Sequence, residues 1–195
     1  MTQLENLKKY NIILASGSPR RRELLGMLDI PFRVMTGIDV DESYPSTLDS
    51  RQVPLFLANL KADAYLAEIK DNDLIITADT VVIVDNEVIG KPQNREDAIN
   101  MLRKLSGKTH SVISGVTVVT SSRRESFDAE TLVHFGQLSD SEIEYYVDRY
   151  KPYDKAGAYG IQEWIGAVGV TGINGSYYNV MGLPINRLYR LLTSF

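Results

Sequence analysis

The sequence contains no cysteine, which excludes disulfide bonds, thiolate metal ligands and a cysteine nucleophile together. It contains only two histidines, His110 and His134, which lie far apart and do not show the spacing of metal ligands. We therefore expect both histidines to be ordinary residues of strands. The absence of cysteine is also compatible with the reducing conditions of the cytoplasm, and we expect the protein to be located there.

A long hydrophobic run is also missing. The first residues contain no apolar signal core, and no later stretch has the length of a membrane-spanning helix, so we expect no membrane partner. Positive charge is not in excess, because 21 lysines and arginines stand against 25 acidic residues and give a net charge of −4. Proteins that bind a nucleic acid polymer are usually basic, so we expect no such partner. A small phosphorylated ligand needs only a few cationic side chains.

The pattern of apolar residues predicts a chain that mixes strands and helices. At 195 residues, with 44% hydrophobic and 24% charged residues, and without repeats or linkers, the sequence predicts a single domain of two lobes over residues 1–195. Strands are predicted at residues 11–15, 32–36, 74–78, 81–84, 87–89, 110–120, 125–135 and 167–173, with a hairpin turn at Asp85-Asn86. Helices are predicted at residues 19–28, 53–68, 94–107, 139–150 and 184–193, and a compact loop at residues 175–181.

Asp79 is a charged residue between two apolar runs, residues 74–78 and 81–84. Packing alone does not explain a carboxylate in such a sequence. Because ligands in open α/β sheets bind beyond the carboxyl ends of strands, we expect Asp79 at the end of a buried parallel strand, facing a cleft. The alternative is a local turn formed by the aspartate.

The turn-rich stretch of residues 16–22 is basic and follows its own apolar run. Ser18 is placed to cap a helix that has Pro19 in its first position. The first turn of this helix then carries Arg20 and Arg21 beside unpaired backbone N–H groups, which is a favourable place for a phosphate. The alternative is that these arginines solvate a helix face.

Two lysines are candidates for the same site. Lys91 lies between Gly90 and Pro92, which restricts its backbone and suits a side chain that must be aimed. Lys61 lies on the inward stripe predicted for residues 53–68, where it either snorkels to solvent or meets an anion in a cleft. The residues predicted for that stripe are Leu57, Leu60, Ala64 and Ala67.

Two further segments carry polar groups in irregular sequence. Residues 39–42 include Asp39, Asp41 and Glu42, a cluster that is either solvated surface or a source of ligands for magnesium. The glycine-rich residues 153–162 end at Gln162, whose amide offers a donor and an acceptor to the edge of a base. The alternative for that segment is a structural loop.

Five motifs, in order along nearly the whole chain, resemble the Maf family. They are LASGSPRR at residues 14–21, ADTVV at 78–82, GKP at 90–92, DKAGAYGIQ at 154–162 and YYNVMGLP at 177–184. The resemblance implies a mixed α/β fold, with a strongly twisted central sheet flanked by helices and two lobes around a cleft, similar to the inosine triphosphate pyrophosphatases. It also implies hydrolysis of a nucleoside triphosphate to the monophosphate and pyrophosphate.

The resemblance further implies which bases are read. The sequence around Asp79 and Gln162 is similar to the branch of the family that acts on dTTP and UTP and differs from the branch that acts on 7-methyl-GTP. Arg20, Thr80 and Gln162 match the specificity positions of the first branch. Modified pyrimidine analogues are further candidate substrates.

Roles in the chemistry follow from the same resemblance. Asp79 is expected to orient and deprotonate the attacking water and, together with Glu42, to hold a divalent metal, magnesium or alternatively manganese. Asp41 stays open as the alternative to Glu42. The phosphate chain is expected to contact Lys61, Lys91, Ser16, Arg20 and Arg21.

Two other functions stay open at this point. A nucleotidyltransferase also uses a strand followed by a turn with glycine, serine and arginine and a later lysine. The family is associated with arrest of septum formation, so a nucleotide-binding regulator without catalysis is the second alternative. The family resemblance also implies a homodimer.

Overall fold

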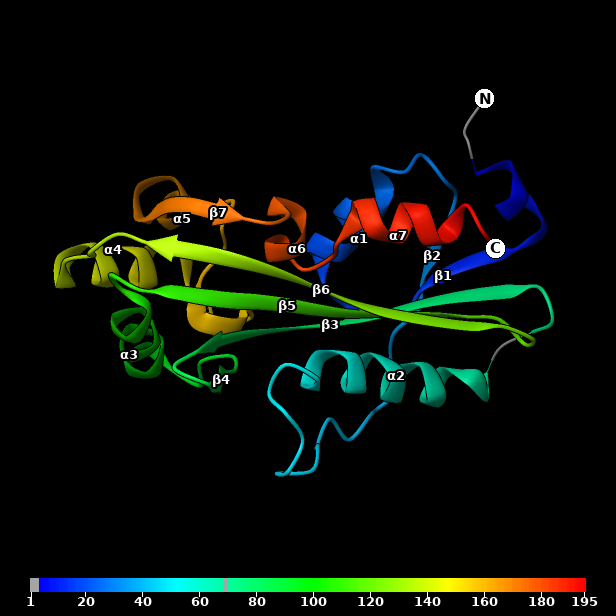
Figure 1. Cartoon of the computed structure of the whole chain (residues 1–195), viewed down its shortest axis with the longest axis horizontal. Coiled ribbons are helices and arrows are strands. Elements are labelled where there is room, and N and C mark those ends of the chain that lie inside the picture. Colours follow the sequence, from blue (N-terminus) through cyan, green and yellow to red (C-terminus); the bar gives the residue numbers. More distant parts are fainter. Residues whose placement is uncertain (1–3, 69) are drawn as a thin grey trace. The chain divides into compact units, whose positions relative to one another are not determined.

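A central mixed sheet dominates the computed structural model, which describes residues 4–68 and 70–195 (Figure 1). Within these residues the sheet has seven strands in the order β2-β1-β3-β5-β6-β7, with β4 paired to β3. The strands are β1 (Asn11–Leu14), β2 (Arg33–Val34), β3 (Asp73–Val84), β4 (Glu87–Ile89), β5 (Thr109–Val119), β6 (Arg124–Phe135) and β7 (Val170–Asn174). β1 is parallel to β2 and β3, whereas β4 is antiparallel to β3 and β7 to β6.

Helices lie between and after the strands. They are the 3₁₀ helices η1 (Glu5–Lys9) and η2 (Ala156–Ala158) and the α-helices α1 (Pro19–Gly26), α2 (Val53–Leu66), α3 (Arg95–Leu105), α4 (Asp140–Tyr150), α5 (Trp164–Gly169), α6 (Tyr177–Met181) and α7 (Ile185–Leu192). The prediction of a mixed α/β fold with a central sheet flanked by helices is confirmed. None of the described helices is both long and apolar enough to span a membrane.

The chain divides into two compact units, each assembled from separate segments. Unit 1 contains the chain up to Asp79 together with Ser114–Ala129 and Gly182–Phe195, and unit 2 contains Thr80–Ile113 and Glu130–Met181. Three of the four boundaries between the segments fall inside β3, β5 and β6, and the fourth lies between α6 and α7.

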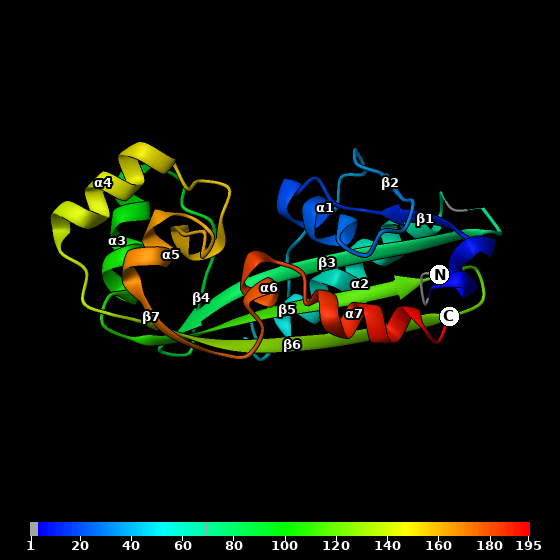
Figure 2. The same ribbon diagram turned by 90° about the horizontal axis from the view of Figure 1, so that it is seen from above.

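In unit 1, α2 covers one face of the sheet, while α1 and α7 cover the other (Figures 1 and 2). Ala62 and Tyr65 of α2 pack against Ile75 of β3 in a fully apolar cluster. The N-terminal end of α2 approaches β5 so closely that a Cβ atom on Gly115 would lie 2.4 Å from backbone atoms of Leu55. Glycine at position 115 therefore sets how near α2 lies to the sheet.

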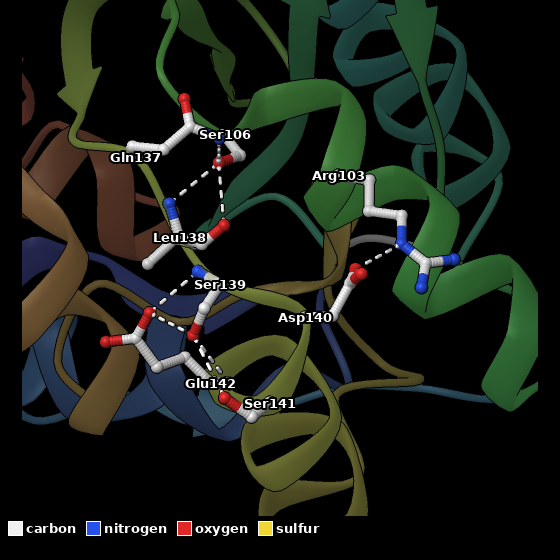
Figure 3. A network of polar contacts seen from close by, with 8 residues as sticks. All are labelled: Arg103, Ser106, Gln137, Leu138, Ser139, Asp140, Ser141 and Glu142. Carbon is white, nitrogen blue, oxygen red and sulfur yellow. Dashed lines mark hydrogen bonds and ion pairs between the residues drawn. The ribbon is translucent and has the colours of Figure 1, made fainter.

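In unit 2, α3 and α4 lie side by side, and a polar network joins the end of one to the start of the other (Figure 3). The Ser106 hydroxyl accepts the backbone N–H of Leu138 at 2.8 Å. Ser139 and Glu142 then form a capping box at the first turn of α4. The predicted start of this helix is confirmed, and its reciprocal side-chain bonds satisfy backbone donors that would otherwise lack partners.

Most local signals were interpreted correctly. Ser18 caps α1 and Asn94 caps α3, each through its side-chain oxygen. Asp85 and Asn86 both have positive φ, 52° and 65°, as the predicted two-residue hairpin turn requires. Other boundaries moved, since β2 is only two residues long and α1 ends at Gly26.

The face that α2 buries was predicted wrongly. Of the expected stripe only Leu57 is buried, whereas Leu60 and Ala64 are half-buried and Ala67 is exposed. The buried residues are instead Val53, Pro54, Leu57, Ala58, Ala62 and Tyr65. Apolar residues lie on almost every side of this helix, so their spacing does not single out one face.

The region after Gln162 was also predicted wrongly. The last strand begins at Val170 rather than at residue 167, because α5 occupies the preceding positions. Residues 177–181, predicted as part of a compact loop, form the single helical turn α6. Both helices are short, and a pattern of one or two turns gives almost no periodic signal.

Candidate active site

Asp79 lies inside β3, and its side chain faces α2. Side chains two residues apart in a strand point to the same face, so Asp79 shares its face with Ile75 and Thr77. Ile75 packs against α2, and the Thr77 hydroxyl donates to the carbonyl oxygen of Ala58 in α2 at 2.7 Å. The expectation that Asp79 ends a strand is therefore wrong, since residues 74–78 and 81–84 belong to one continuous strand.

Lys61 of α2 meets the carboxylate of Asp79. Its Nζ lies 2.7 Å from Oδ1 of Asp79 and 3.1 Å from Oε1 of Glu42. The side chains of Lys61 and Asp79 are only 15% and 13% exposed. Of the two alternatives for Lys61, the contact with an anion is the one observed. Reduced contact with water strengthens such a pair relative to one on the open surface.

Glu42, and not Asp41, faces this pair. Asp41 is exposed and accepts the backbone N–H of Ser43 at 3.0 Å, which forms a local turn. Glu42 reaches Lys61 from the same loop, with 54% of its side chain exposed. Two carboxylates therefore converge on one ammonium group.

Arg21 holds the beginning of α1 in place. Its Nε donates to the carbonyl oxygen of Gly182 at 2.9 Å, and a terminal nitrogen lies 3.4 Å from the Ser16 hydroxyl. The backbone N–H of Arg21 is also the group that the Ser18 cap accepts. The predicted helix start thus forms and brings Ser16 and Arg21 together.

The arginine at the start of α1, Arg21, interacts electrostatically with Asp79. Burial lowers the pKa of the Arg21 guanidinium. The negative charges of Asp79 and Glu42 oppose this shift, whereas the positive charge of Arg20 adds to it. Arginine nevertheless stays protonated at neutral pH. A cation that has lost much of its hydration, next to a second cation, is a favourable place for a phosphate group.

The remaining candidates lie in unit 2. Thr80 follows in β3, and Lys91 is exposed just after β4. The carbonyl oxygen of Gly90 accepts the N–H of Gly157 at 3.0 Å, which ties the segment of Lys91 to the one that leads to Gln162. Unit 1 thus gathers Ser16, Arg20, Arg21, Glu42, Lys61 and Asp79, and unit 2 holds Thr80, Lys91 and Gln162.

Gln162 lines a hollow in unit 2. The hollow has a volume of about 480 Å³, within the range of small-molecule sites. Ile161 and Tyr177 add apolar surface to it, and Glu163 and Thr171 add polar groups. Gln162 itself is exposed, so its amide is available to a ligand.

Sequence reasoning overlooked three residues behind Gln162. Lys155 is only 8% exposed and contacts Glu163, which in turn accepts the hydroxyl of Tyr146. Lys155 and its neighbour Asp154 were visible as a charged pair in a glycine-rich segment. Tyr146 lies in α4, and no pattern in the sequence marked it as a candidate site residue.

The carboxylates of unit 1 fit a divalent cation that takes part of its ligands from elsewhere. Among residues 4–68 and 70–195, no group of three or more His, Cys, Asp or Glu side chains could hold a metal ion by itself. Asp79 and Glu42 nevertheless converge on a positive group, the Lys61 ammonium. Magnesium is commonly held by one or two carboxylates together with substrate phosphates and water, so this donor set fits it.

Comparison with known sequences identifies relatives over nearly the whole chain. A family model described as Maf-like protein matches residues 11–195. A protein from Parabacteroides distasonis named dTTP/UTP pyrophosphatase is 56% identical over 192 residues, covering 98% of this chain and 100% of that protein. A protein of the same name from Phocaeicola vulgatus is 58% identical over 186 residues, covering 95% and 96%.

A solved structure shares the fold. The HAM1 protein from Coxiella burnetii superimposes with a TM-score of 0.52 at 12% sequence identity, covering 95% of this chain and 100% of that one. At this identity the likeness shows the fold alone.

Proposed function

Because the chain belongs to the Maf family, we propose that it hydrolyses dTTP and UTP to the nucleoside monophosphate and pyrophosphate. Relatives that carry the name dTTP/UTP pyrophosphatase are more than half identical over almost all of the chain, as the values of 56% and 58% state. The observation that carries the proposal is the convergence of Asp79 and Glu42 on Lys61, next to the arginines of α1.

Asp79 is proposed to orient the water and take its proton. The water oxygen forms a bond to the α phosphorus while the bond to the bridging oxygen breaks, and the electron pair leaves with pyrophosphate. Lys61 occupies Oδ1 of Asp79, and no side chain or backbone group of the described residues donates to its Oδ2. The ion pair fixes the carboxylate and leaves one oxygen for the water, as a general base requires.

The cations are proposed to bind the phosphate chain. Arg20 and Arg21 present two positive charges in the first turn of α1, where the helix dipole also favours an anion. Lys91 is exposed, and within the described part of the chain its ammonium group has no ion-pair partner. These groups stabilise the negative charge that grows on the departing pyrophosphate.

Asp79 and Glu42 are proposed as the residues that hold a divalent metal, magnesium or alternatively manganese. When bound, the metal neutralises phosphate oxygens as a Lewis acid. Lys61 contacts both carboxylates, and its positive charge reduces the repulsion between them.

Thr80, Gln162 and Arg20 are proposed to determine which base is accepted. Support comes from the position of Gln162 at a hollow of about 480 Å³, which has room for a pyrimidine ring. Three further predictions remain proposals. They are the homodimer implied by the family resemblance, the single domain of two lobes inferred from length and composition, and the cytoplasmic location inferred from the absence of cysteine.

A pyrophosphate-release assay tests the proposed function. The purified protein is incubated with dTTP, UTP, CTP, dATP or GTP, with and without magnesium and without any acceptor. We expect equal amounts of monophosphate and pyrophosphate, fastest from dTTP and UTP. Release of orthophosphate, or no reaction without a sugar phosphate acceptor, would rule out the proposal and favour a phosphatase or a nucleotidyltransferase.

A further inference from the structure

Gln162 alone cannot explain a preference for uracil over cytosine. Uracil presents a carbonyl acceptor at C4 and an N–H donor at N3, whereas cytosine presents an amino donor and a nitrogen acceptor. A glutamine amide carries one acceptor and one NH₂ group, and rotation by half a turn lets it pair with either base. Selection between the two bases therefore needs another group in the same hollow.

Glu163 is the charged side chain next to Gln162, and it lines the same hollow. A carboxylate is an acceptor without any donor. A free carboxylate at this place would bind the amino group of cytosine and repel the carbonyl oxygens of uracil and thymine. Whether the Glu163 carboxylate is free or already bound by other protein groups thus decides whether the hollow favours amino or keto bases.

Both oxygens of Glu163 are already occupied. Oε1 lies 3.1 Å from Nζ of Lys155, and Oε2 accepts the hydroxyl of Tyr146. The side chains of Lys155 and Glu163 are only 10% and 19% exposed. Burial raises the pKa of the Tyr146 hydroxyl, and the hydrogen bond to Glu163 raises it further. Tyr146 therefore keeps its proton and remains a donor at neutral pH.

The segment that carries Gln162 and Glu163 packs closely against two glycines, Gly160 and Gly166. A Cβ atom on Gly160 would lie 2.9 Å from Cδ of Glu163, and the N–H of Gly160 donates to the Tyr146 hydroxyl at 3.0 Å. A Cβ atom on Gly166 would lie 1.8 Å from the carbonyl oxygen of Ile161. Positions 160 and 166 therefore have no room for a side chain in this arrangement of the segment.

We propose that Lys155 and Tyr146 are positioning residues for base selection. By binding both oxygens of Glu163, they withhold its carboxylate from the base and leave the amide of Gln162 to pair with a keto pyrimidine. This inference rests on the proposed function and deepens it, because it names what separates uracil and thymine from cytosine at the same site.

The test is the ratio of kcat/KM for UTP to that for CTP in a Lys155→Met variant. Removing the ammonium group frees Oε1 of Glu163, so CTP gains a charged acceptor and the ratio should fall about tenfold, as expected for a hydrogen bond to a charged group. The matched control is Lys108→Met, which breaks an exposed ion pair of 2.6 Å with Asp85 in the same unit. The control should keep the wild-type ratio.

A double variant separates positioning from loss of structure. In Lys155→Met/Glu163→Gln the negative charge is gone, and the ratio should return toward the wild-type value even where kcat is lower. Tyr146→Phe provides a second test that keeps the aromatic ring, frees Oε2 and should shift the ratio in the same direction. An unchanged ratio in Lys155→Met and Tyr146→Phe, or a double variant that does not recover, overturns the proposal.

Binding experiments keep this inference apart from the proposed function. Calorimetric titration with the non-hydrolysable α,β-methylene analogues of UTP and CTP needs no turnover. If the wild-type protein hydrolyses no triphosphate but prefers the UTP analogue, and Lys155→Met loses that preference, the proposed function fails and the positioning role stands. If the wild-type protein binds both analogues equally or neither of them, the positioning role is refuted.

Discussion

The ammonium nitrogen of Lys61 lies 2.7 Å from Oδ1 of Asp79 and joins α2 to an interior position of β3. Both side chains are largely withdrawn from water, at 15% and 13% exposure. Truncating either side chain would leave the other group without a hydrogen-bond partner in a poorly solvated place, which is more damaging than losing a pair on the open surface. The pair therefore stabilises unit 1 and, under the proposed function, also fixes the position of the Asp79 carboxylate that acts as the general base.

Replacing Asp79 with asparagine should separate these two contributions. The amide oxygen still accepts the Lys61 ammonium, so the fold and nucleotide binding are retained, whereas the proton acceptor is lost. We expect kcat for dTTP to fall by about a hundredfold or more. Kinetics and calorimetric binding measured on the same preparation check this, and a kcat near the wild-type value would contradict the role of Asp79 as base.

Glu42 and Asp41 form a matched pair for testing the metal. Glu42→Gln should raise the magnesium concentration for half-maximal activity by about tenfold, a typical effect for a residue near a metal site. Asp41→Asn should leave it unchanged, because Asp41 bonds only its own loop at Ser43 among the described contacts. A titration of activity against magnesium distinguishes them. Equal shifts in both variants would contradict a metal-binding role that belongs to Glu42 and not to Asp41.

Gly115→Ala should move α2 and with it Lys61. The added methyl group would lie 2.4 Å from backbone atoms of Leu55. Unlike the end of a flexible side chain, these atoms cannot move aside without a shift of the helix. We expect unfolding free energy to fall by about 1–3 kcal/mol, as for overpacked cores, and kcat to fall as well. Gly26→Ala is the control, because its added Cβ would meet nothing within 4 Å apart from the adjacent residues and the backbone of its own helix. Wild-type stability and kcat in Gly115→Ala would show that α2 is not held by this contact.

His110 should make stability depend on pH. It is buried in β5, where its Nε2 lies 2.7 Å from the Tyr159 hydroxyl, and burial lowers its pKa to about 4. The unfolded chain takes up the proton first as pH falls below about 6.5, so stability is lost between there and pH 4. We expect unfolding free energy to be about 2 kcal/mol lower at pH 5 than at pH 7 from this residue.

Urea unfolding at both pH values measures this effect. His110→Phe removes the titrating group and keeps an aromatic ring between Phe135 and Tyr159. Whatever its stability at pH 7, the variant should show a smaller loss on acidification than the wild-type protein. Identical losses in the two proteins would show that other groups cause the pH dependence.

Features encoded in neighbouring residues could be predicted from the sequence. The Ser18 cap depends on a side chain and a backbone N–H three residues away, and the Asp85-Asn86 turn depends on two residues that tolerate positive φ. These interactions need no knowledge of the rest of the molecule. The helix start that carries Arg20 and Arg21 was accordingly placed correctly.

Features that depend on a distant partner could not be predicted in the same way. Asp79 looked like the end of a strand, because a lone carboxylate is costly inside a sheet. Lys61, eighteen positions earlier, removes that cost, so β3 continues through Asp79. Likewise, the face of α2 is chosen by the closeness that Gly115 allows and not by the periodicity of α2 itself.

The three segments of unit 1 have a consequence for biosynthesis. Asp79 and Lys61 precede unit 2 along the chain and are synthesised before it, whereas α7 and the Gly182 carbonyl that anchors Arg21 are synthesised after it. Unit 2 is complete at Met181, before that final segment exists. The carboxylates and cations of unit 1 therefore reach their final arrangement only after the segment that begins at Gly182 has been synthesised.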